Sequence, residues 1–374
     1  MLPKNLYNYS IIIFSCFLLL GSTFVLNKNN TRTNIALSFN NKITPSTYLV
    51  AGGDIMLSRY IGYLNKNQGY DRIFTGENYH PLSSFSTCDR GECTLLFNLE
   101  SLFTTPDNDI PKGGFLFQSN PQNVETLNQL KKNNSLVLSL ANNHIINVGY
   151  KGVKMTQEIL QENSIAHIGA GLSPEESEQM RSEEKNGIKL CFQSYSYDGQ
   201  YVKVGEGKIS RNALNAIKIK EQLQIMDEEN CDAKILSLHR GAEYRLHPNR
   251  GQKNLAHELI DAGTDLIIGG HSHVPGEIEQ YKGKYIIYSL GNFLFDQSRG
   301  KRTNSGPYDT IYDHSLQKRT VPTYIALLAG FKIEKRPFGI NIYLDQLEMT
   351  QTNDGIFSSI DNQTYQEMLN NIQQ

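Results

Sequence analysis

The sequence lacks a strong excess of charge of either sign. Its 374 residues include 36 basic and 38 acidic side chains, which gives a formal net charge of -2 at pH 7. This balance provides no global attraction to nucleic acid or to an anionic membrane surface. Nucleic acid is therefore not expected as a partner, and any preference for anions must be local. No internal repeat is visible, so a repeat architecture is not expected.

Cysteine is also scarce, with five residues in the chain. Cys88 and Cys93 lie close together in CDRGEC, Cys191 and Cys231 are well separated, and Cys16 lies in an apolar run. Because no second close cysteine pair accompanies the first, this spacing is weak as a zinc motif. A Cys88–Cys93 disulfide, in a domain outside the cytoplasm, or free thiols are the expected states.

Long apolar runs are absent except for one, residues 11–26 (IIIFSCFLLLGSTFVL), which follows Lys4. The run is longer than a typical signal-peptide core and slightly shorter than the roughly 20 residues of a full bilayer span. No A-x-A cleavage signal follows it, and the segment before Cys16 does not read as a lipoprotein box. We expect residues 1–26 to form an uncleaved signal anchor, a single-pass membrane helix that leaves the folded domain extracytoplasmic. Cleavage is the alternative.

The remaining chain divides into a tether, a folded body and a tail. Residues 27–46 are polar, rich in Asn and Thr and without an apolar period, which is typical of a tether. In the body, residues 47–349, apolar runs of strand length alternate with stretches of helical period, which predicts an α/β domain with doubly covered strands. Residues 350–374 are rich in Asn and Gln, and we expect a peripheral C-terminal tail.

The elements of this body are predicted from the same periodicities. Strands are expected in residues 48–54, 94–100, 136–144, 188–197, 233–241, 265–273 and 285–293. Helices are expected in residues 121–132, 152–163, 212–229 and 252–262, the last with Gly263 as its C-cap. Residues 330–349 alternate apolar and polar side chains around Arg336, Pro337 and Gly339, which predicts an antiparallel hairpin that closes a sheet.

Two histidines follow one of the predicted strands, in GTDLIIGGHSHVPG, residues 263–276. In an extended chain the side chains at i and i+2 point the same way, so His271 and His273 can converge on a metal ion. Taken alone, the pair could equally be structural.

The other strand ends carry side chains of the same kind. Asp54, Glu100, Asn143 and His239 each end or follow an apolar strand, and Asn98 and His144 accompany them. The carboxyl ends of strands in an α/β sheet share one edge, where such folds bind ligands. Carboxylates, an amide and imidazoles suit a divalent cation, and six ligands suit two ions roughly 3.5 to 4 Å apart with a bridging carboxylate such as Glu100. The six candidates are Asp54, Glu100, Asn143, His239, His271 and His273.

Each of these residues also has a structural interpretation. Asp54 could cap a helix that starts at Ile55, the segment ANNH could be a turn, and a lone histidine such as His239 is commonly a satisfied core residue. Coincidence at five strand ends is harder to accept. Of the nine histidines in the chain, four fall at these ends.

Five segments, in this order, resemble the bacterial capsule-synthesis CapA family, also called the poly-γ-glutamate biosynthesis family. They are AGGDIMLSR, FNLES, LANNHIINVGYKG, HRGAEY and the block from PNRGQKN to GNFLFD, and together they extend over residues 48–296. That family is similar in turn to the calcineurin-like metallophosphoesterases. The resemblance implies a four-layer α-β-β-α sandwich of the metallophosphoesterase type, here preceded by an N-terminal membrane helix.

The resemblance also implies roles for individual residues. It makes the six candidates metal ligands, and it makes His144 a general acid, with orientation of a neighbouring group as the alternative. We expect Arg240, Glu243, Tyr244 and Asn292 to bind substrate or support the cleft. Arg245, His247 and Arg250 form a local basic cluster with Arg240, and Arg299, Lys301 and Arg302 lie in a later loop; solvated surface charge is the alternative for both.

The chain departs from the pattern of these families at three places. The Asp-x-His opening of the metallophosphoesterases is missing, because Asp54 is followed by Ile55 and Met56. Asn147 stands where an Asp is usual, and Arg240 where an aromatic residue is usual.

The expected function is that of a membrane-tethered, extracytoplasmic capsule or poly-γ-glutamate biosynthesis protein. It would be a metal-dependent hydrolase or transferase with two divalent ions, and the ligand set does not distinguish Mn, Fe and Zn. Its expected partners are the membrane, an anionic polymer such as poly-γ-glutamate and a membrane synthase complex. The alternatives are a non-catalytic polymer-binding or export subunit and a secreted metal-dependent phosphoesterase.

Overall fold

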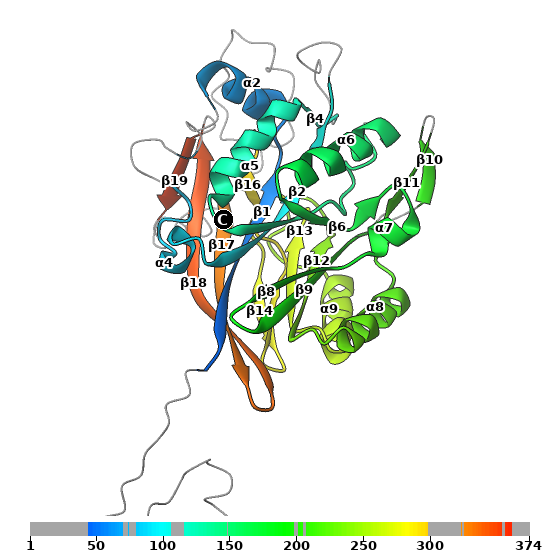
Figure 1. Ribbon diagram of the computed structural model, residues 1–374, viewed down its shortest axis with the longest axis vertical. Coiled ribbons are helices and arrows are strands. Elements are labelled where there is room, and N and C mark those ends of the chain that lie inside the picture. The colour runs from blue at the N-terminus through cyan, green and yellow to red at the C-terminus, as the bar shows by residue number, and fades with distance from the viewer. Residues whose placement is uncertain are drawn as a thin grey trace, which may run out of the picture. The chain divides into compact units, whose positions relative to one another are not determined.

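The computed structural model describes residues 44–69, 80–105, 116–147, 149–197, 201–204, 207–297, 325–353 and 356–360, together with Phe74 and Thr323 (Figure 1). The described residues from Pro45 onward belong to one compact unit. The expected membrane segment, residues 1–26, and nearly all of the tether lie outside the described residues. Within the described part of the chain, no helix has the length and apolar character needed to cross a membrane.

The first sheet contains both parallel and antiparallel strands, in the order β19-β18-β17-β1-β2-β5-β6, with β16 paired to β1. The strands β1, β2, β5, β6 and β16 are parallel neighbours, and β17, β18 and β19 add to β1 in antiparallel order. The bounds are β1 Ser46–Ile55, β2 Cys93–Leu99, β5 Ser135–Ser139, β6 Ala166–Ile168, β16 Asn292–Leu294, β17 Ile325–Arg336, β18 Gly339–Asn353 and β19 Ile356–Ile360.

The second sheet has the order β14-β15-β13-β12-β9-β8, with four parallel central strands and an antiparallel strand at each edge. The bounds are β8 Arg181–Lys185, β9 Ile188–Ser196, β12 Ala233–His239, β13 Leu266–Gly270, β14 Ile278–Tyr281 and β15 Lys284–Ile287. Two small sheets complete the strands, formed by β3 Leu102–Phe103, β4 Gln118–Ser119, β7 Ala170–Gly171, β10 Tyr201–Val204 and β11 Gly207–Arg211.

The helices cover the outer faces of the two large sheets. Side chains at their first turns fix where several begin: Asn215 accepts from the backbone of Ile217 and Lys218, and Asn249 forms a capping box with Gln252. The bounds are α2 Arg59–Gln68, α4 Ser86–Asp89, η2 Pro121–Asn123, α5 Val124–Lys131, α6 Gly149–Glu162, α7 Pro174–Glu178, α8 Ala216–Glu228 and α9 Arg250–Asp261.

Three hydrophobic cores separate four layers. One core lies between the two large sheets, and it includes Leu49 of β1 and Phe192 of β9. A second packs the outer face of the first sheet against α2, α4, α5 and α6, and a third packs β9, β12 and β13 against α8 and α9. The alternation of β1 explains this: Leu49 and Ala51 face the core between the sheets, and Tyr48 and Val50 face the helices. The predicted α/β fold class is confirmed, with two large mixed sheets.

The boundaries differ from expectation at several places. The strand expected in residues 285–293 is divided into β15 and β16, which lie in different sheets, and the strand expected in residues 136–144 already ends at Ser139. The hairpin predicted around Pro337 is present, but β18 continues past residue 349, where the folded body was expected to end, and pairs with β19 at Met349–Asn353. Backbone hydrogen bonds form this pairing, and residues 350–353 are polar in the sequence, so the end of β18 gave no apolar signal. The helix expected from residue 212 begins at Ala216, because Asn215 caps it.

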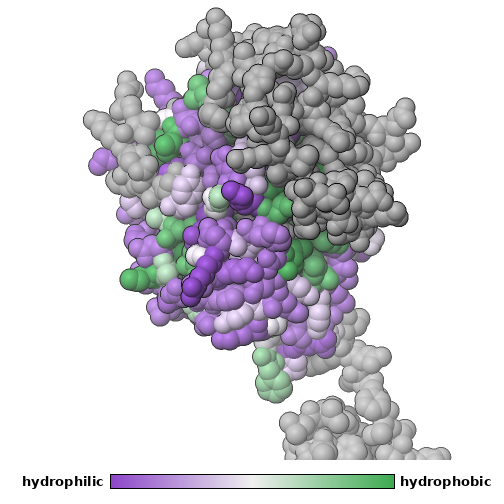
Figure 2. Space-filling model, turned by 180° about the vertical axis from the view of Figure 1, so that it is seen from behind, coloured by the Kyte–Doolittle hydropathy of each residue, from purple (hydrophilic) through white to green (hydrophobic). Residues whose placement is uncertain are grey.

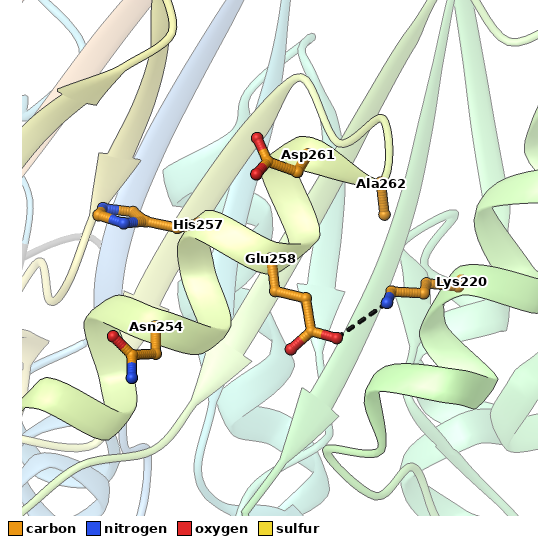
Figure 3. Close-up of a pocket in the computed structure, with 6 residues that line it drawn as sticks. All are labelled: Lys220, Asn254, His257, Glu258, Asp261 and Ala262. Atoms are coloured by element: carbon orange, nitrogen blue, oxygen red, sulfur yellow. Dashed lines mark hydrogen bonds and ion pairs between the residues drawn. The ribbon is translucent and has the colours of Figure 1, made fainter.

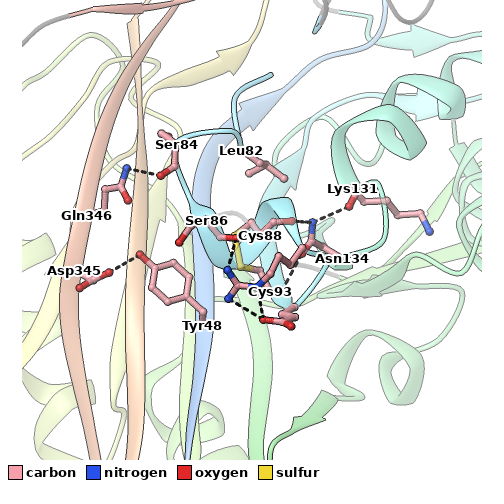
Figure 4. The surroundings of a disulfide bond; sticks show 12 residues. Tyr48, Leu82, Ser84, Ser86, Cys88, Cys93, Lys131, Asn134, Asp345 and Gln346 are labelled. Atoms are coloured by element: carbon pink, nitrogen blue, oxygen red, sulfur yellow. Dashed lines mark hydrogen bonds and ion pairs between the residues drawn. A yellow bond between two sulfur atoms is a disulfide. The ribbon is translucent and has the colours of Figure 1, made fainter. Parts of the chain in front are cut away.

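Two disulfides cross-link the described part of the chain. The expected Cys88–Cys93 bond is present, and Cys191 is bonded to Cys231. Figure 4 shows that Asn134 lies beside the first bond: its Oδ1 accepts from Cys93 N at 2.9 Å, and its Nδ2 donates to Cys88 O at 2.9 Å. The loop between α4 and β2 is therefore fixed covalently and by one buried amide.

Candidate metal centre

The carboxyl ends of strands from both large sheets meet at one edge. Asp54 lies near the end of β1, Glu100 follows β2, and His239 is the last residue of β12. Glycine permits this approach, because a Cβ atom at Gly270 would lie 3.0 Å from Asp54 Oδ1 and 3.6 Å from His239 Nδ1. The predicted convergence of the strand ends is therefore present in the fold.

Two carboxylates form the buried centre of this cluster. Asp54 is 0% and Glu100 1% exposed, and one ligand atom from each, with one from His239, lie within 4.8 Å of one another. Glu100 Oε1 is 3.3 Å from His239 Nε2, whereas the buried Oε2 has no hydrogen-bond partner among the described residues. Burial raises the pKa of Asp54 to about 7 and the pKa of Glu100 well above its usual range. Both carboxyls therefore favour the neutral form unless a cation compensates their charge.

The imidazoles complete the cluster. His239 Nε2 lies 2.9 Å from Asn143 Oδ1 and 3.2 Å from His271 Nδ1. His273 Nδ1 lies 3.7 Å from Asp54 Oδ2, so short distances connect all six predicted ligands. Burial lowers the pKa of His273 to about 4 and the pKa of His239 well below its usual value. Both rings are thus neutral at physiological pH, which is the form that binds metals.

The expectation that the two histidines share an extended strand was wrong. Strand β13 ends at Gly270, and His271 and His273 have φ values of 87° and 58°, in the left-handed region. Their rings still lie near each other, with centroids 6.2 Å apart. The turn, rather than strand alternation, directs both imidazoles to the cluster. Such backbone geometry is costly for residues other than glycine and is typical of functional sites.

Amide side chains connect the ligands to the scaffold. Asn98 Nδ2 donates to Asp54 Oδ1 at 2.9 Å, and Asn98 Oδ1 accepts from Asn142 Nδ2 at 3.1 Å. Asn142 also donates to Leu99 O at 2.8 Å, and it accepts from the backbone of His144 at 3.1 Å. The sequence did not predict this role of Asn142. In the segment ANNH only Asn143 and His144 were expected to take part in the site.

Asn292 lies inside the cluster rather than at its mouth. It is 1% exposed, and its Oδ1 lies 2.8 Å from His273 Nδ1. Its Nδ2 donates to Gln297 Oε1 and to Thr323 O, which fixes Oδ1 as the atom that faces the ring. His273 Nδ1 is therefore the donor, and Nε2 is the atom available to a metal.

His144 lies on one side of the ligand set. Its Nδ1 is 2.9 Å from Asn147 Oδ1, and its ring stacks on Phe117 with centroids 3.9 Å apart. Asn147 Oδ1 also accepts from Phe117 N at 3.4 Å, so it is the oxygen that faces the imidazole and Nδ1 carries the proton. His144 lies near enough to lower the pKa values of His239 and His273 by its charge.

A buried ion pair beside the cluster was not predicted from the sequence. Arg59 binds Asp296 through Nε, at 3.0 Å from Oδ2, and through Nη2, and the two side chains are 3% and 4% exposed. The guanidinium lies 4.7 Å from the centroid of Phe117 and 5.7 Å from that of Phe295. Phe295 in turn contacts His273 edge to face at 5.0 Å. The two residues lie within the motifs AGGDIMLSR and GNFLFD, but neither motif indicates that they form a pair.

Three of the four residues expected to bind substrate or support the cleft, Arg240, Glu243 and Tyr244, occupy the loop after β12. Arg240 is half-buried, Glu243 is exposed, and the charge of Glu243 contributes to the raised pKa of Glu100. Tyr244 adopts φ 60°, and its ring centroid lies 6.1 Å from that of His273. In the basic cluster Arg245, His247 and Arg250 are exposed. Arg299, Lys301 and Arg302 lie outside the described residues.

A wide groove on the helical layer is distinct from this cluster. It lies between α8 and α9, has a volume of about 570 Å³ and is shown in Figure 3. Lys220 and Glu258 form an ion pair across it at 2.8 Å. Its polar side chains are thus partly neutralised by one another, and they do not form a ligand set like that at the strand ends.

The fold and the cluster together define a class: a four-layer α/β protein with a candidate divalent-metal centre at the carboxyl edge of its two sheets. Residues 48–297 match the family model described as bacterial capsule synthesis protein PGA_cap, and the chain belongs to this family. The resemblance noted in the sequence is thereby confirmed.

Curated relatives agree with the family. The chain is 30% identical over 253 residues to the PGA biosynthesis protein CapA of Bacillus subtilis (strain 168), with 66% of this chain and 62% of that protein covered. It is 28% identical over 251 residues to the capsule biosynthesis protein CapA of Bacillus anthracis, with 66% and 59% covered. The match thus spans less than two thirds of either Bacillus protein. A probable polyglutamine synthesis accessory protein of Mycobacterium tuberculosis is 29% identical over 284 residues, with 66% and 74% covered.

Solved structures were also found similar. The calcineurin-like phosphoesterase YfkN from Bacillus subtilis has a TM-score of 0.39 at 14% identity, with 88% of this chain and 100% of that chain covered. A hypothetical protein from Thermus thermophilus has a TM-score of 0.44 at 15% identity, with 79% and 98% covered.

Proposed function

We propose that this protein is a membrane-tethered, extracytoplasmic, divalent-metal-dependent hydrolase or transferase of capsule synthesis that acts on an anionic polymer such as poly-γ-glutamate. Family membership supports the link to capsule synthesis. The observation that carries the metal-dependent chemistry is the buried Glu100 carboxylate, whose Oε2 has no partner among the described residues, beside Asp54 and His239.

The donor set fits a divalent cation. The raised pKa values of Asp54 and Glu100 show that negative charge is unfavourable in this buried site. The nearby imidazoles are neutral and do not compensate that charge. A cation bound among them would offset that cost. Asp54, Glu100, Asn143, His239, His271 and His273 would hold the ions. Bound divalent ions supply Lewis-acid polarisation and a bound water of lowered pKa.

The chain's own side chains would perform the remaining work. Asn147 holds the proton of His144 on Nδ1, so that Nε2 faces away from Asn147 and can exchange a proton with a leaving group. Arg240 and Tyr244, in the loop after β12, would orient the anionic substrate. Asn98 and Asn292 would keep Asp54 and His273 in fixed orientations.

The proposed location rests on sequence and on disulfides. The apolar run of residues 11–26 would anchor the chain, and residues 27–43 would connect it to β1. The Cys88–Cys93 and Cys191–Cys231 bonds are typical of an oxidising compartment. They support a folded domain on the outer side of the membrane.

Metal analysis tests this proposal. The natively expressed protein is purified without chelator and without added metal, and its metal content is measured by elemental mass spectrometry. We expect close to two ions per chain in the native protein and a loss of most metal in the Asp54→Asn, His271→Ala double variant. The matched control is Asp345→Asn, His247→Ala, which changes the same residue types at exposed positions. The proposed function would be refuted if the native protein and the double variant were both free of metal and equally active.

The exposed basic cluster favours a second candidate, a non-catalytic subunit that binds the polymer. Arg245, His247 and Arg250 are exposed near the loop that carries Arg240. This candidate predicts that binding of poly-γ-glutamate persists in the metal-site double variant and is lost when the three basic residues are neutralised together.

A further inference from the structure

The tip of the β17–β18 hairpin exposes an aromatic side chain that no described residue covers. Arg336 pairs with Gly339, so Pro337 and Phe338 form the turn. Phe338 is 99% exposed, far more than any other large hydrophobic residue of the described chain. In Figure 1 the hairpin projects at the lower end, and Figure 2 shows hydrophobic surface protruding at that end. At this exposure the Phe338 side chain makes almost no packing contact with the described part of the domain.

The hairpin lies beside the place where the chain enters the domain. Ser46, the first residue of β1, pairs with Glu334, and Lys335 N donates to Pro45 O at 2.9 Å. Residues 27–43 lie between Thr44 and the apolar run that ends at residue 26. Random-coil statistics give a polar tether of that length a root-mean-square span of roughly 20 to 25 Å. An anchor in the bilayer would therefore keep this end of the domain close to the membrane.

The distal hairpin is positively charged. Lys332, Lys335 and Arg336 are basic, and Glu334 is the acidic residue among them. Lys332 and Arg336 both pair with Glu334, so one carboxylate serves two cations. Lys335 pairs with Asp232 at 2.7 Å. Basic side chains near an anionic leaflet are attracted to it, and an aromatic ring is favoured at the headgroup level.

We propose that the β17–β18 tip docks on the surface of an anionic lipid bilayer, with Phe338 inserted at the headgroup level and Arg336 against lipid phosphates. This inference rests on the membrane tether in the proposed function. It makes the domain contact the bilayer at two points, the tether and the hairpin. Ser46 and Asp54 lie near opposite ends of β1, so the metal centre would face away from the membrane at a height of roughly 25 Å above the start of the strand.

Fluorescence of a single tryptophan tests the docking. The chain contains no Trp, so Phe338→Trp places a unique probe at the tip. The full chain is reconstituted into phosphatidylglycerol vesicles with and without brominated lipid. We expect a blue-shifted emission that brominated lipid quenches and aqueous acrylamide reaches poorly. The control Ile217→Trp, at a 70% exposed position on α8, should be quenched by acrylamide and not by the lipid.

The charge dependence gives a second measurement. Adding Arg336→Gln to the tryptophan variant should lower the ratio of docked to undocked tips about fivefold in phosphatidylglycerol vesicles. Phosphatidylcholine vesicles should show weaker quenching by brominated lipid with either protein.

Two outcomes would overturn the inference, and they differ in what else they affect. In the first outcome the protein floats with the vesicles, but acrylamide quenches the tip tryptophan as strongly as the control, or brominated lipid does not quench it. The docking alone then fails. If the full chain does not float with vesicles at all, the proposed membrane tether fails with it. Metal content is independent of both outcomes.

Discussion

Glu100 Oε1 and His239 Nε2 lie 3.3 Å apart, although the two residues stand at the ends of strands from different sheets. Glu100 follows β2 of the first sheet, and His239 ends β12 of the second. The candidate metal centre therefore lies across the junction of the two sheets, and its geometry depends on how they pack. Both side chains are buried, so the contact is protected from solvent.

The first prediction concerns the stability of the metal-free protein. In the folded state the pKa of Asp54 is about 7 instead of 3.8, so the folded chain holds a proton that the unfolded chain releases between these values. The Asp54 contribution to stability therefore falls as the pH rises from about 4 to about 7, by a total on the order of 4 kcal/mol. An amide side chain at this position would not ionise. We expect chelator-treated Asp54→Asn to gain stability relative to the native chain across this window, measured by urea unfolding.

The buried histidines do not disturb this comparison. The pKa values of His239 and His273 are lowered, so their contributions are lost as the pH falls, which is the opposite slope. They are present in both proteins and largely cancel in the difference. With saturating metal the native chain should be more stable than Asp54→Asn, because the variant lacks a metal ligand. A difference that is flat with pH would contradict the assignment.

A second prediction concerns Asn292. Its Oδ1 orients His273, so Asn292→Ala should weaken metal binding about 10- to 100-fold without removing a ligand. Competition with a metal chelator measures the affinity. Asn292→Asp keeps an acceptor for His273 Nδ1 and should retain more affinity than Asn292→Ala; equal loss in both would indicate that orientation of the ring is not the cause.

The Arg59–Asp296 pair supports a third prediction. Arg59→Met leaves a buried Asp296 carboxylate without its cation, which should lower the free energy of unfolding by about 3 to 5 kcal/mol. The double variant Arg59→Met, Asp296→Leu should lose less than the sum of the single variants, since no isolated charge stays buried. Urea unfolding of the four proteins gives the coupling, and additive losses would argue against the pair.

A fourth prediction separates chemistry from metal binding at His144. If the metal centre hydrolyses a chromogenic phosphate ester with added Mn²⁺, His144→Asn should lower kcat by about 10² to 10⁴, since the variant cannot protonate the leaving group. Its metal content should equal that of the native protein, because His144 is outside the six-residue ligand set. His257→Asn, a control on α9 outside both the ligand set and the basic cluster, should change neither quantity. Absence of turnover over a series of metals would count against the phosphoesterase alternative.

The disulfides give a fifth prediction. The Cys191–Cys231 bond spans 40 residues and the Cys88–Cys93 bond spans 5. Loop-closure entropy predicts that replacing the longer pair by Ser costs about 4 kcal/mol and replacing the shorter pair about 2 kcal/mol. Thermal or urea unfolding under oxidising conditions measures both. A larger loss for the shorter loop would show that local packing around Asn134, rather than chain entropy, dominates.

The sequence indicated the fold class and most of the site because local patterns encode both. Apolar runs located β1, β2, β12 and β13, since buried parallel strands need side chains that are apolar on both faces. The side chains at the ends of those runs were placed by a general rule of α/β sheets, and the structure brings the six predicted ligands together.

Other features had no local signal. The Arg59–Asp296 pair joins residues far apart in the chain, and its burial depends on Phe117 and Phe295 meeting around it. The edge strand β19 is only five residues long, so only its pairing with β18 identifies it. The left-handed turn at His271 replaced the extended strand that the spacing suggested.

By itself, the sequence determined which residues lie in buried strands, where those strands end, and which ligand-type side chains stand there, because these properties depend on neighbours along the chain. Only the tertiary structure decided which atoms face one another. Glu100 contacts His239, and Asn292 contacts His273, because the two large sheets pack together with the carboxyl ends of their strands side by side. That packing depends on the sum of many non-local contacts, which no short segment of the sequence contains.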